Sequence, residues 1–219
     1  MTTGLDQIKL SLRRTDWVVA SIIVLCCLIE VALVAADLGL IGSRLWRSQA
    51  YQFGGFWPGL LRDWQANYPT QPYAMFGTYA FLHGGWVHLV INMITLYSLG
   101  HAILDRVGRL GFLAVYLAAI LGGAAGYGLL NTSPQPMVGA SGALFGLAGA
   151  WVAWLYIDRF AAQIGLWPVA RIVALLIAMN IVMWWAMDGQ LAWQTHLGGF
   201  VAGWIMALLL DPRARPEDL

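Results

Sequence analysis

Charge is scarce in this chain of 219 residues: 11% of them are charged, against about 25% in ordinary water-soluble proteins. This composition excludes a soluble, disordered or collagen-like chain, and a net charge of +1 offers no basic surface for a nucleic-acid partner. Cysteine occurs only as the adjacent pair Cys26 and Cys27 in an apolar run, so it indicates neither a disulfide framework nor a metal site. Hydrophobic residues reach 60%, and 12 residues are Trp, a composition typical of a membrane protein.

Six stretches are apolar enough to cross a bilayer core of about 30 Å as helices. They run, within a few residues, over Trp17–Ala36, Tyr79–Ile103, Leu110–Leu130, Ser141–Ile157, Ile172–Met187 and Trp193–Leu210. The sequence therefore predicts an all-α polytopic membrane protein, a six-helix bundle over residues 17–210 between the tails 1–16 and 211–219. A cleaved signal peptide is the alternative for the first stretch, which is long for that role and contains Glu30. The simplest explanation for a charged residue in this apolar stretch is that Glu30 lies at the membrane interface.

Lys and Arg are distributed unevenly between the two sides of this topology. Nine fall in the tails and in the second and fourth loops, whereas Arg44, Arg47 and Arg62 fall in the long first loop, residues 41–78. Because positive loops stay in the cytoplasm, we expect both termini there, in a plasma membrane such as the bacterial inner membrane. The first loop is rich in aromatic residues next to charge, so we expect it to lie in the membrane interface; a poorly ordered loop is the alternative.

Strongly polar side chains gather where three predicted spans begin. The second span has His83, His88 and Asn92 near its start, the fourth span starts at Ser141, and the first turn of the sixth span contains His196. These three spans run in the same direction, so the five residues share the outer leaflet and face the exterior or periplasm. Polar groups within spans are costly and indicate function. Hydrogen bonds between helices would be the ordinary explanation, but Ser and His are also the minimal pair of nucleophile and base.

Small residues flank both members of this pair. Gly139 and Gly142 bracket Ser141, and Gly142, Gly146 and Ala150 repeat every four residues; Gly199 and Gly203 follow His196. A serine hydroxyl reaches a neighbouring imidazole only if the two helices come into near backbone contact, which such residues allow.

The motifs HGGWVHLVINM, GASG and THLGG, in this order and in six spans, resemble those of rhomboid intramembrane serine proteases over Phe81–Gly203. The resemblance implies Ser141 as nucleophile, His196 as general base, and His88 and Asn92 with the Ser141 N–H as oxyanion donors. It further implies that Phe145 packs on the catalytic imidazole, that His83 supports the site, and that transmembrane helices are the substrates. We expect a Ser–His dyad without a carboxylate, because Asp188 lies in a turn.

Two positions depart from the family pattern. Thr195 replaces a small Ala, and Ala74 and Met75 stand where a Trp-Arg pair often precedes the first histidine, so the anchoring of the first loop is open. No HExxH motif or pair of mid-span aspartates occurs, and we expect neither metal nor cofactor. A non-proteolytic rhomboid-like binder of transmembrane helices and a small polar channel are the alternatives. The oligomeric state is left open.

Overall fold

The computed structural model describes residues 16–210. The basic residues of the predicted tails, Lys9, Arg13, Arg14, Arg213 and Arg215, lie outside this range. Over the described residues the fold is all α-helical, as predicted, and contains no strand, only one isolated bridge between Phe56 and Met137.

Five long helices carry the fold: α2 (Trp17–Asp37), α5 (Trp86–Leu130), α6 (Ser141–Ala161), α7 (Trp167–Ala186) and α8 (Trp193–Leu209). Three of them, α2, α5 and α7, are long and apolar enough by themselves to cross a membrane. The 45 residues of α5 are two helices that meet at a kink at Gly108, where φ is 69°. These two helices correspond to the predicted second and third spans, which the kink joins in place of a loop.

The predicted start of the second span is wrong by several residues. Tyr79–Phe81 forms the separate turn η2, and α5 begins only at Trp86. Gly85, with φ of 106°, holds the backbone in a conformation that interrupts a helix. His83 therefore lies in the turn before the helix rather than within a span.

Two other predicted boundaries also shift. Helix α6 continues four residues past Ile157 to Ala161, and α7 begins five residues earlier than predicted, at Trp167, with Pro168 in its first turn. Helices continue beyond the apolar run that marks the bilayer core, and proline is well tolerated in the first helical turn.

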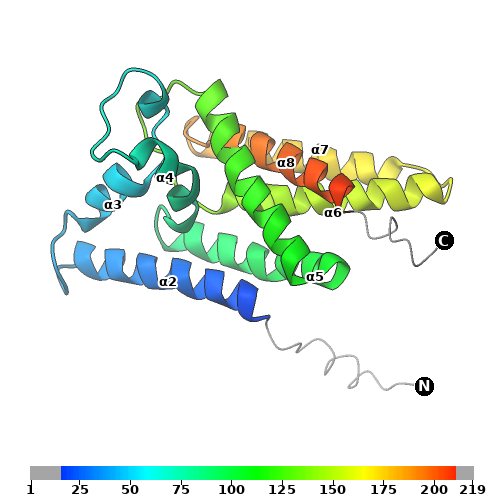
Figure 1. Ribbon diagram of the computed structural model, residues 1–219, viewed down its shortest axis with the longest axis horizontal. Helices are drawn as coiled ribbons and strands as arrows, with labels where there is room; N and C mark the ends of the chain where they lie inside the picture. Colours follow the sequence, from blue (N-terminus) through cyan, green and yellow to red (C-terminus); the bar gives the residue numbers. More distant parts are fainter. Residues whose placement is uncertain (1–15, 211–219) are drawn as a thin grey trace.

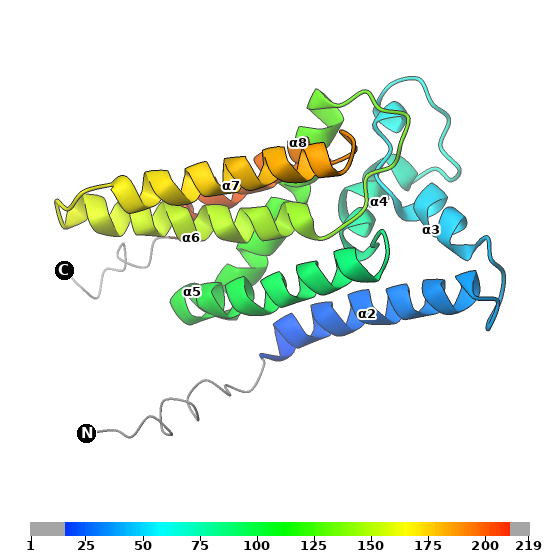
Figure 2. The same cartoon turned by 180° about the vertical axis from the view of Figure 1, so that it is seen from behind.

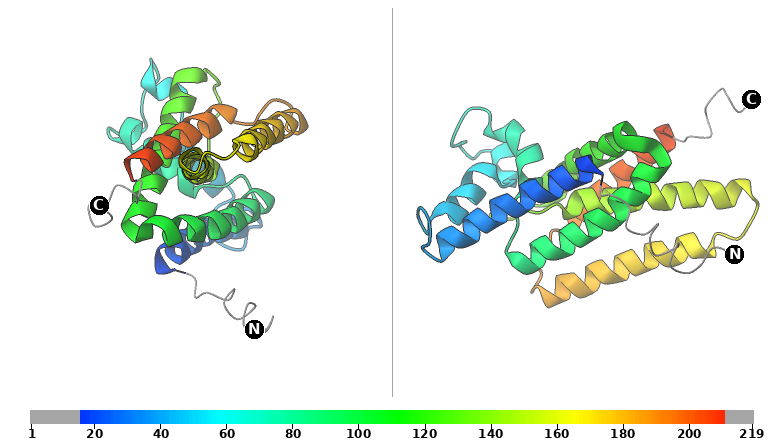
Figure 3. Two further views of the ribbon diagram at one scale, coloured as in Figure 1. Left: turned by 90° about the vertical axis from the view of Figure 1, so that its right-hand side faces the viewer. Right: turned by 90° about the horizontal axis from the view of Figure 1, so that it is seen from below.

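The starts of α5, α6 and α8 lie at one end of the molecule, beside the first loop (Figure 1), and the same arrangement is visible from behind (Figure 2). Helix α2 begins and α8 ends on the side away from the first loop (Figure 1). Helix α7 lies to one side of the bundle (Figure 3), and only 6% of its apolar stretch is buried inside the protein.

The first loop is built of short helices, so the alternative of a poorly ordered loop is wrong. It contains α3 (Trp46–Gly54), the 3-10 turn η1 (Pro58–Leu61) and α4 (Gln71–Thr78). The buried ring of Phe56 joins the loop to the helices, since it packs edge-on against Phe76, Tyr79 and Tyr127.

Helices α6 and α8 approach to backbone contact through the predicted glycines. A Cβ atom added to Gly199 would overlap the carbonyl oxygen of Gly142, and one added to Gly203 would overlap that of Gly146. The small residues therefore do what their spacing indicates: they bring the first turns of two helices within reach of each other's side chains.

Candidate active site

Ser141 and His196 are in hydrogen-bond contact. Ser141 is the first residue of α6 and His196 is the fourth of α8, and the distance between Ser141 Oγ and His196 Nε2 is 2.9 Å. His196 is buried, with 4% of its surface exposed. A serine hydroxyl and an imidazole at this distance can exchange a proton directly, provided that Nε2 is the unprotonated ring nitrogen.

The imidazole of His196 is held in place by the ring of Phe145, one helical turn after the serine. Their centroids are 4.2 Å apart and their planes differ by 9°, a stacked arrangement. This is the contact that the sequence resemblance implies for Phe145. It fixes the plane of the imidazole against α6.

Thr195, the departure from the family pattern, is accommodated by glycines. A Cβ on Gly142 of α6 would lie 2.6 Å from Thr195 Oγ1, and one on Gly123 of α5 would lie 2.7 Å from it. The larger side chain fits because neither neighbour has a side chain of its own.

Asn180 of α7 is a polar neighbour of the pair that the sequence analysis missed. Its Oδ1 lies 2.6 Å from His196 Nδ1, on the side of the ring away from Ser141. One signal could have identified it: Asn180 is the only amide, hydroxyl or ionisable side chain between Ile172 and Ala186, inside a predicted span.

His88 and Asn92 face the loop that leads into Ser141. A Cβ on Gly139 would lie 2.8 Å from His88 Nε2 and 3.7 Å from Asn92 Nδ2, so both nitrogens border the backbone two residues before the serine. The Gly84 N–H donates to His88 Nδ1 at 3.3 Å, which leaves the proton of a neutral imidazole on Nε2. The Asn92 Nδ2 group is a buried donor without a partner among residues 16–210.

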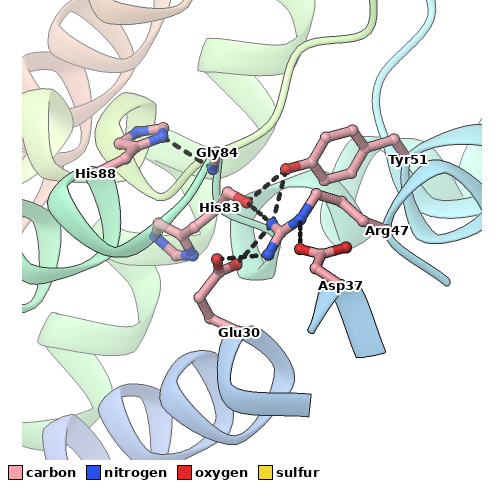
Figure 4. Close-up of polar contacts among 7 residues, drawn as sticks. All are labelled: Glu30, Asp37, Arg47, Tyr51, His83, Gly84 and His88. Carbon is pink, nitrogen blue, oxygen red and sulfur yellow. Dashed lines mark hydrogen bonds and ion pairs between the residues drawn. The ribbon is translucent and has the colours of Figure 1, made fainter. Parts of the chain in front are cut away.

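His83 contributes its backbone rather than its ring to the polar contacts around the site. The ring is buried and packs edge-on against His88, with centroids 5.3 Å apart, and neither ring nitrogen has a hydrogen-bond partner in the described part of the chain. The carbonyl oxygen accepts hydrogen bonds from Tyr51 Oη at 2.6 Å and from Arg47 Nη1 at 3.2 Å (Figure 4).

Arg47 explains both the anchoring of the first loop and the role of Glu30. Its guanidinium donates to both carboxylate oxygens of Glu30, at 2.9 and 3.2 Å, and to Asp37 at 2.6 Å (Figure 4). Glu30 is fully buried within the protein, where the loop arginine neutralises it. Arg47 therefore connects α3 to α2 and to the turn that precedes α5. His88 lies in the first turn of α5.

A cavity of about 450 Å³ opens beside His196, between α7 and the pair α6 and α8. Its walls are aromatic and aliphatic, including Phe145, Trp184, Trp193 and Phe200, and its polar side chains are Asn180 and His196. The cavity can hold an apolar side chain next to the Ser–His pair.

Within residues 16–210, neither a carboxylate nor a metal-binding cluster lies at the pair. Asp188 is exposed in the turn after α7, where its φ of 49° is unusual for a residue with a side chain. Among the residues from 16 to 210, no group of three His, Cys, Asp or Glu side chains could hold a metal ion.

Comparisons with known proteins agree with the sequence motifs. Residues 69–213 match the family description "Rhomboid domain". RHOMBOID-like protein 5 of Arabidopsis thaliana is 33% identical over 138 residues, which are 61% of this chain and 43% of that protein. Rhomboid protease GluP of Bacillus subtilis is 34% identical over 135 residues, 61% of this chain and 25% of GluP.

A third relative matches nearly the whole chain. An uncharacterized protein of Mycobacterium bovis is 28% identical over 215 residues, 93% of this chain and 80% of that protein. By contrast, the chain spans less than half the length of the first two relatives.

Proposed function

The chain belongs to the rhomboid family and is an integral membrane protein, and from this premise we propose that it is an intramembrane serine endopeptidase. Ser141 is the nucleophile and His196 the general base. The 2.9 Å contact between Ser141 Oγ and His196 Nε2 is the observation that carries the proposal. The name of the relative GluP, a rhomboid protease, supports it.

The proposed reaction is hydrolysis of a peptide bond through an acyl-enzyme. Ser141 Oγ attacks the substrate carbonyl while His196 Nε2 takes the hydroxyl proton, which then passes to the leaving amine. A water molecule, deprotonated by the same imidazole, attacks the ester carbonyl and releases the new carboxyl end and the free serine.

The negative oxygen that forms during attack would be met by three donors: the Ser141 backbone N–H, His88 Nε2 and Asn92 Nδ2. The backbone N–H belongs to the first turn of α6, where N–H groups lack partners within the helix and the helix dipole is positive. These roles are supported by the Asn92 Nδ2 donor, which has no partner in the described part of the chain, and by the tautomer of His88.

The proposed substrates are transmembrane helices of other proteins, cut near the outer membrane face, with the site open to the periplasm or exterior and both termini cytoplasmic. The apolar cavity beside His196 supports an apolar substrate segment. A protease reads an extended backbone, so the substrate helix must unwind locally. Entry along α7 is favoured because this helix is the least buried of the long apolar ones.

Labelling with a fluorophosphonate serine probe tests the proposal, together with cleavage of single-span model substrates in proteoliposomes. We expect labelling and cleavage in the wild type, loss of both in Ser141→Ala and His196→Ala, and no change in Ser98→Ala, which removes an exposed hydroxyl from α5. Folded protein that neither labels nor cleaves would contradict the proposal and favour a binder of transmembrane helices. Crosslinking of a substrate to α5 and α7 tests the entry route, and exclusive labelling of α2 would reject it.

A further inference from the structure

We infer that Asn180 is a positioning residue for His196, which adds a side chain from α7 to the Ser–His pair. Its amide oxygen accepts the Nδ1–H of the imidazole and holds the tautomer in which Nε2 is free to take the serine proton. This inference rests on the proposed function and concerns how its base is prepared.

The orientation of the Asn180 amide follows from its second hydrogen bond. Asn180 Nδ2 lies 2.9 Å from the backbone carbonyl of Leu176, one turn earlier in α7. A carbonyl oxygen only accepts hydrogen bonds, so the NH₂ end of the amide must face Leu176 and the oxygen must face the imidazole. The reverse orientation would place two acceptors against each other at Leu176.

The amide oxygen in turn fixes the tautomer of the imidazole. Oδ1 cannot donate, so the 2.6 Å contact with His196 Nδ1 requires the proton to be on Nδ1. A neutral imidazole carries one N–H, and Nε2 is therefore the acceptor that faces Ser141 Oγ at 2.9 Å. The buried carboxylate of a Ser-His-Asp triad acts in the same way.

The two contacts of the imidazole restrain different motions. Stacking on Phe145 restrains the plane of the ring, whereas the bond to Asn180 restrains rotation within that plane. A neutral amide suits this position better than a carboxylate, because an ionised side chain within a membrane helix is more costly to bury. Since α7 is otherwise little buried, the bond also fixes this helix to the catalytic end of α8.

Three variants test the role of Asn180 in proteoliposomes with a single-span substrate. Asn180→Leu keeps the approximate shape but has no acceptor, Asn180→Asp retains an acceptor, and Met179→Ala is a control on the neighbouring exposed position of α7. We expect Asn180→Leu to lower kcat by about 10- to 100-fold, by analogy with the loss of a partner that orients a metal-ligating histidine, with KM changed less than about twofold. Asn180→Asp keeps an acceptor for Nδ1 but loses the donor to Leu176 and is costlier to bury, so it should recover only part of the kcat lost in Asn180→Leu. Met179→Ala should leave kcat unchanged.

Fluorophosphonate labelling separates this inference from the proposed function, because the probe requires no transmembrane substrate. If the rate of labelling of Asn180→Leu falls by a factor similar to the fall in kcat, the positioning role is supported. If this variant is labelled at the wild-type rate, the positioning role is overturned, but the proposed protease function is not. If folded wild-type protein is not labelled by the probe, the proposed function itself is contradicted. If Asn180→Leu does not fold, ¹⁵N NMR of His196 in the wild type decides: protonation at Nδ1 supports the inference, and protonation mainly at Nε2 overturns it.

Discussion

Replacement of Arg47 by alanine should weaken the attachment of the first loop to the helix bundle. Arg47 donates hydrogen bonds to Glu30, Asp37, Tyr51 and the backbone carbonyl of His83. The variant removes them all and leaves the carboxylate of Glu30, which has 0% exposure, without its cation.

The unpaired carboxylate decides the size of the effect. Breaking a buried ion pair by removing one partner costs about 3–5 kcal/mol, and we expect the lower end of this range because Arg47 is 21% exposed and water can reach the vacated space. In a chain of this size, about 3 kcal/mol corresponds to a fall in the melting temperature of roughly 6–12 °C. Activity should also fall, since the turn before α5 positions His88, although Tyr51 still bonds the His83 carbonyl.

A buried cysteine provides the assay. Cys26 is fully buried in α2, one helical turn before Glu30, so a thiol-reactive dye detects it only when the bundle opens. In a Cys27→Ser background the temperature of dye reaction therefore reports unfolding. Arg44→Ala is the matched control, because Arg44 is exposed in the same loop and makes no hydrogen bond or ion pair with the part of the chain that the structure describes.

A double variant tests the physical reason. Removing the carboxylate as well, in Glu30→Leu with Arg47→Leu, eliminates the unpaired buried charge, so the double variant should be more stable than Arg47→Leu alone. The reasoning is refuted if Arg47→Ala melts at the same temperature as Arg44→Ala. It is also refuted if the Glu30→Leu substitution, added to Arg47→Leu, lowers the melting temperature further.

Other contacts give sharp expectations. Gly199→Ala should force α8 away from α6, lower stability by about 1–3 kcal/mol and abolish fluorophosphonate labelling, whereas Gly165→Ala, with open space around it, should match the wild type in both assays. Asn92→Ala should lower kcat by about 10²–10³ in the cleavage assay without changing the melting temperature, and an unchanged kcat would remove Asn92 from the oxyanion site. The hydrogen bond from the Val18 N–H lowers the pKa of Asp16 below 3.8. Its stabilisation is present above the unfolded-state value of 3.8 and is lost as the pH falls through the folded-state pKa, so the difference in melting temperature between wild type and Asp16→Asn at pH 7 should shrink as the pH falls below 3.8.

The local pattern of the sequence predicted much of the fold and the Ser–His contact. Long apolar runs fix where helices form, because in lipid every backbone polar group must bond within its own segment. Glycines at intervals of four residues fix which faces of α6 and α8 meet, and these faces bring Ser141 to His196.

Only the tertiary structure placed Asn180 and Arg47. Apart from Arg171 and Asn180, the side chains of α7 are apolar, so its sequence has no polar face from which to read its rotation, and the direction of Asn180 depends on how α7 lies beside α6 and the start of α8. Arg47 reaches Glu30 because the loop folds as short helices, a conformation fixed by distant contacts such as those of Phe56 rather than by periodicity. The sequence determined the helices and the contact between Ser141 and His196; the long-range packing of α7 and the first loop decided which side chains surround that pair.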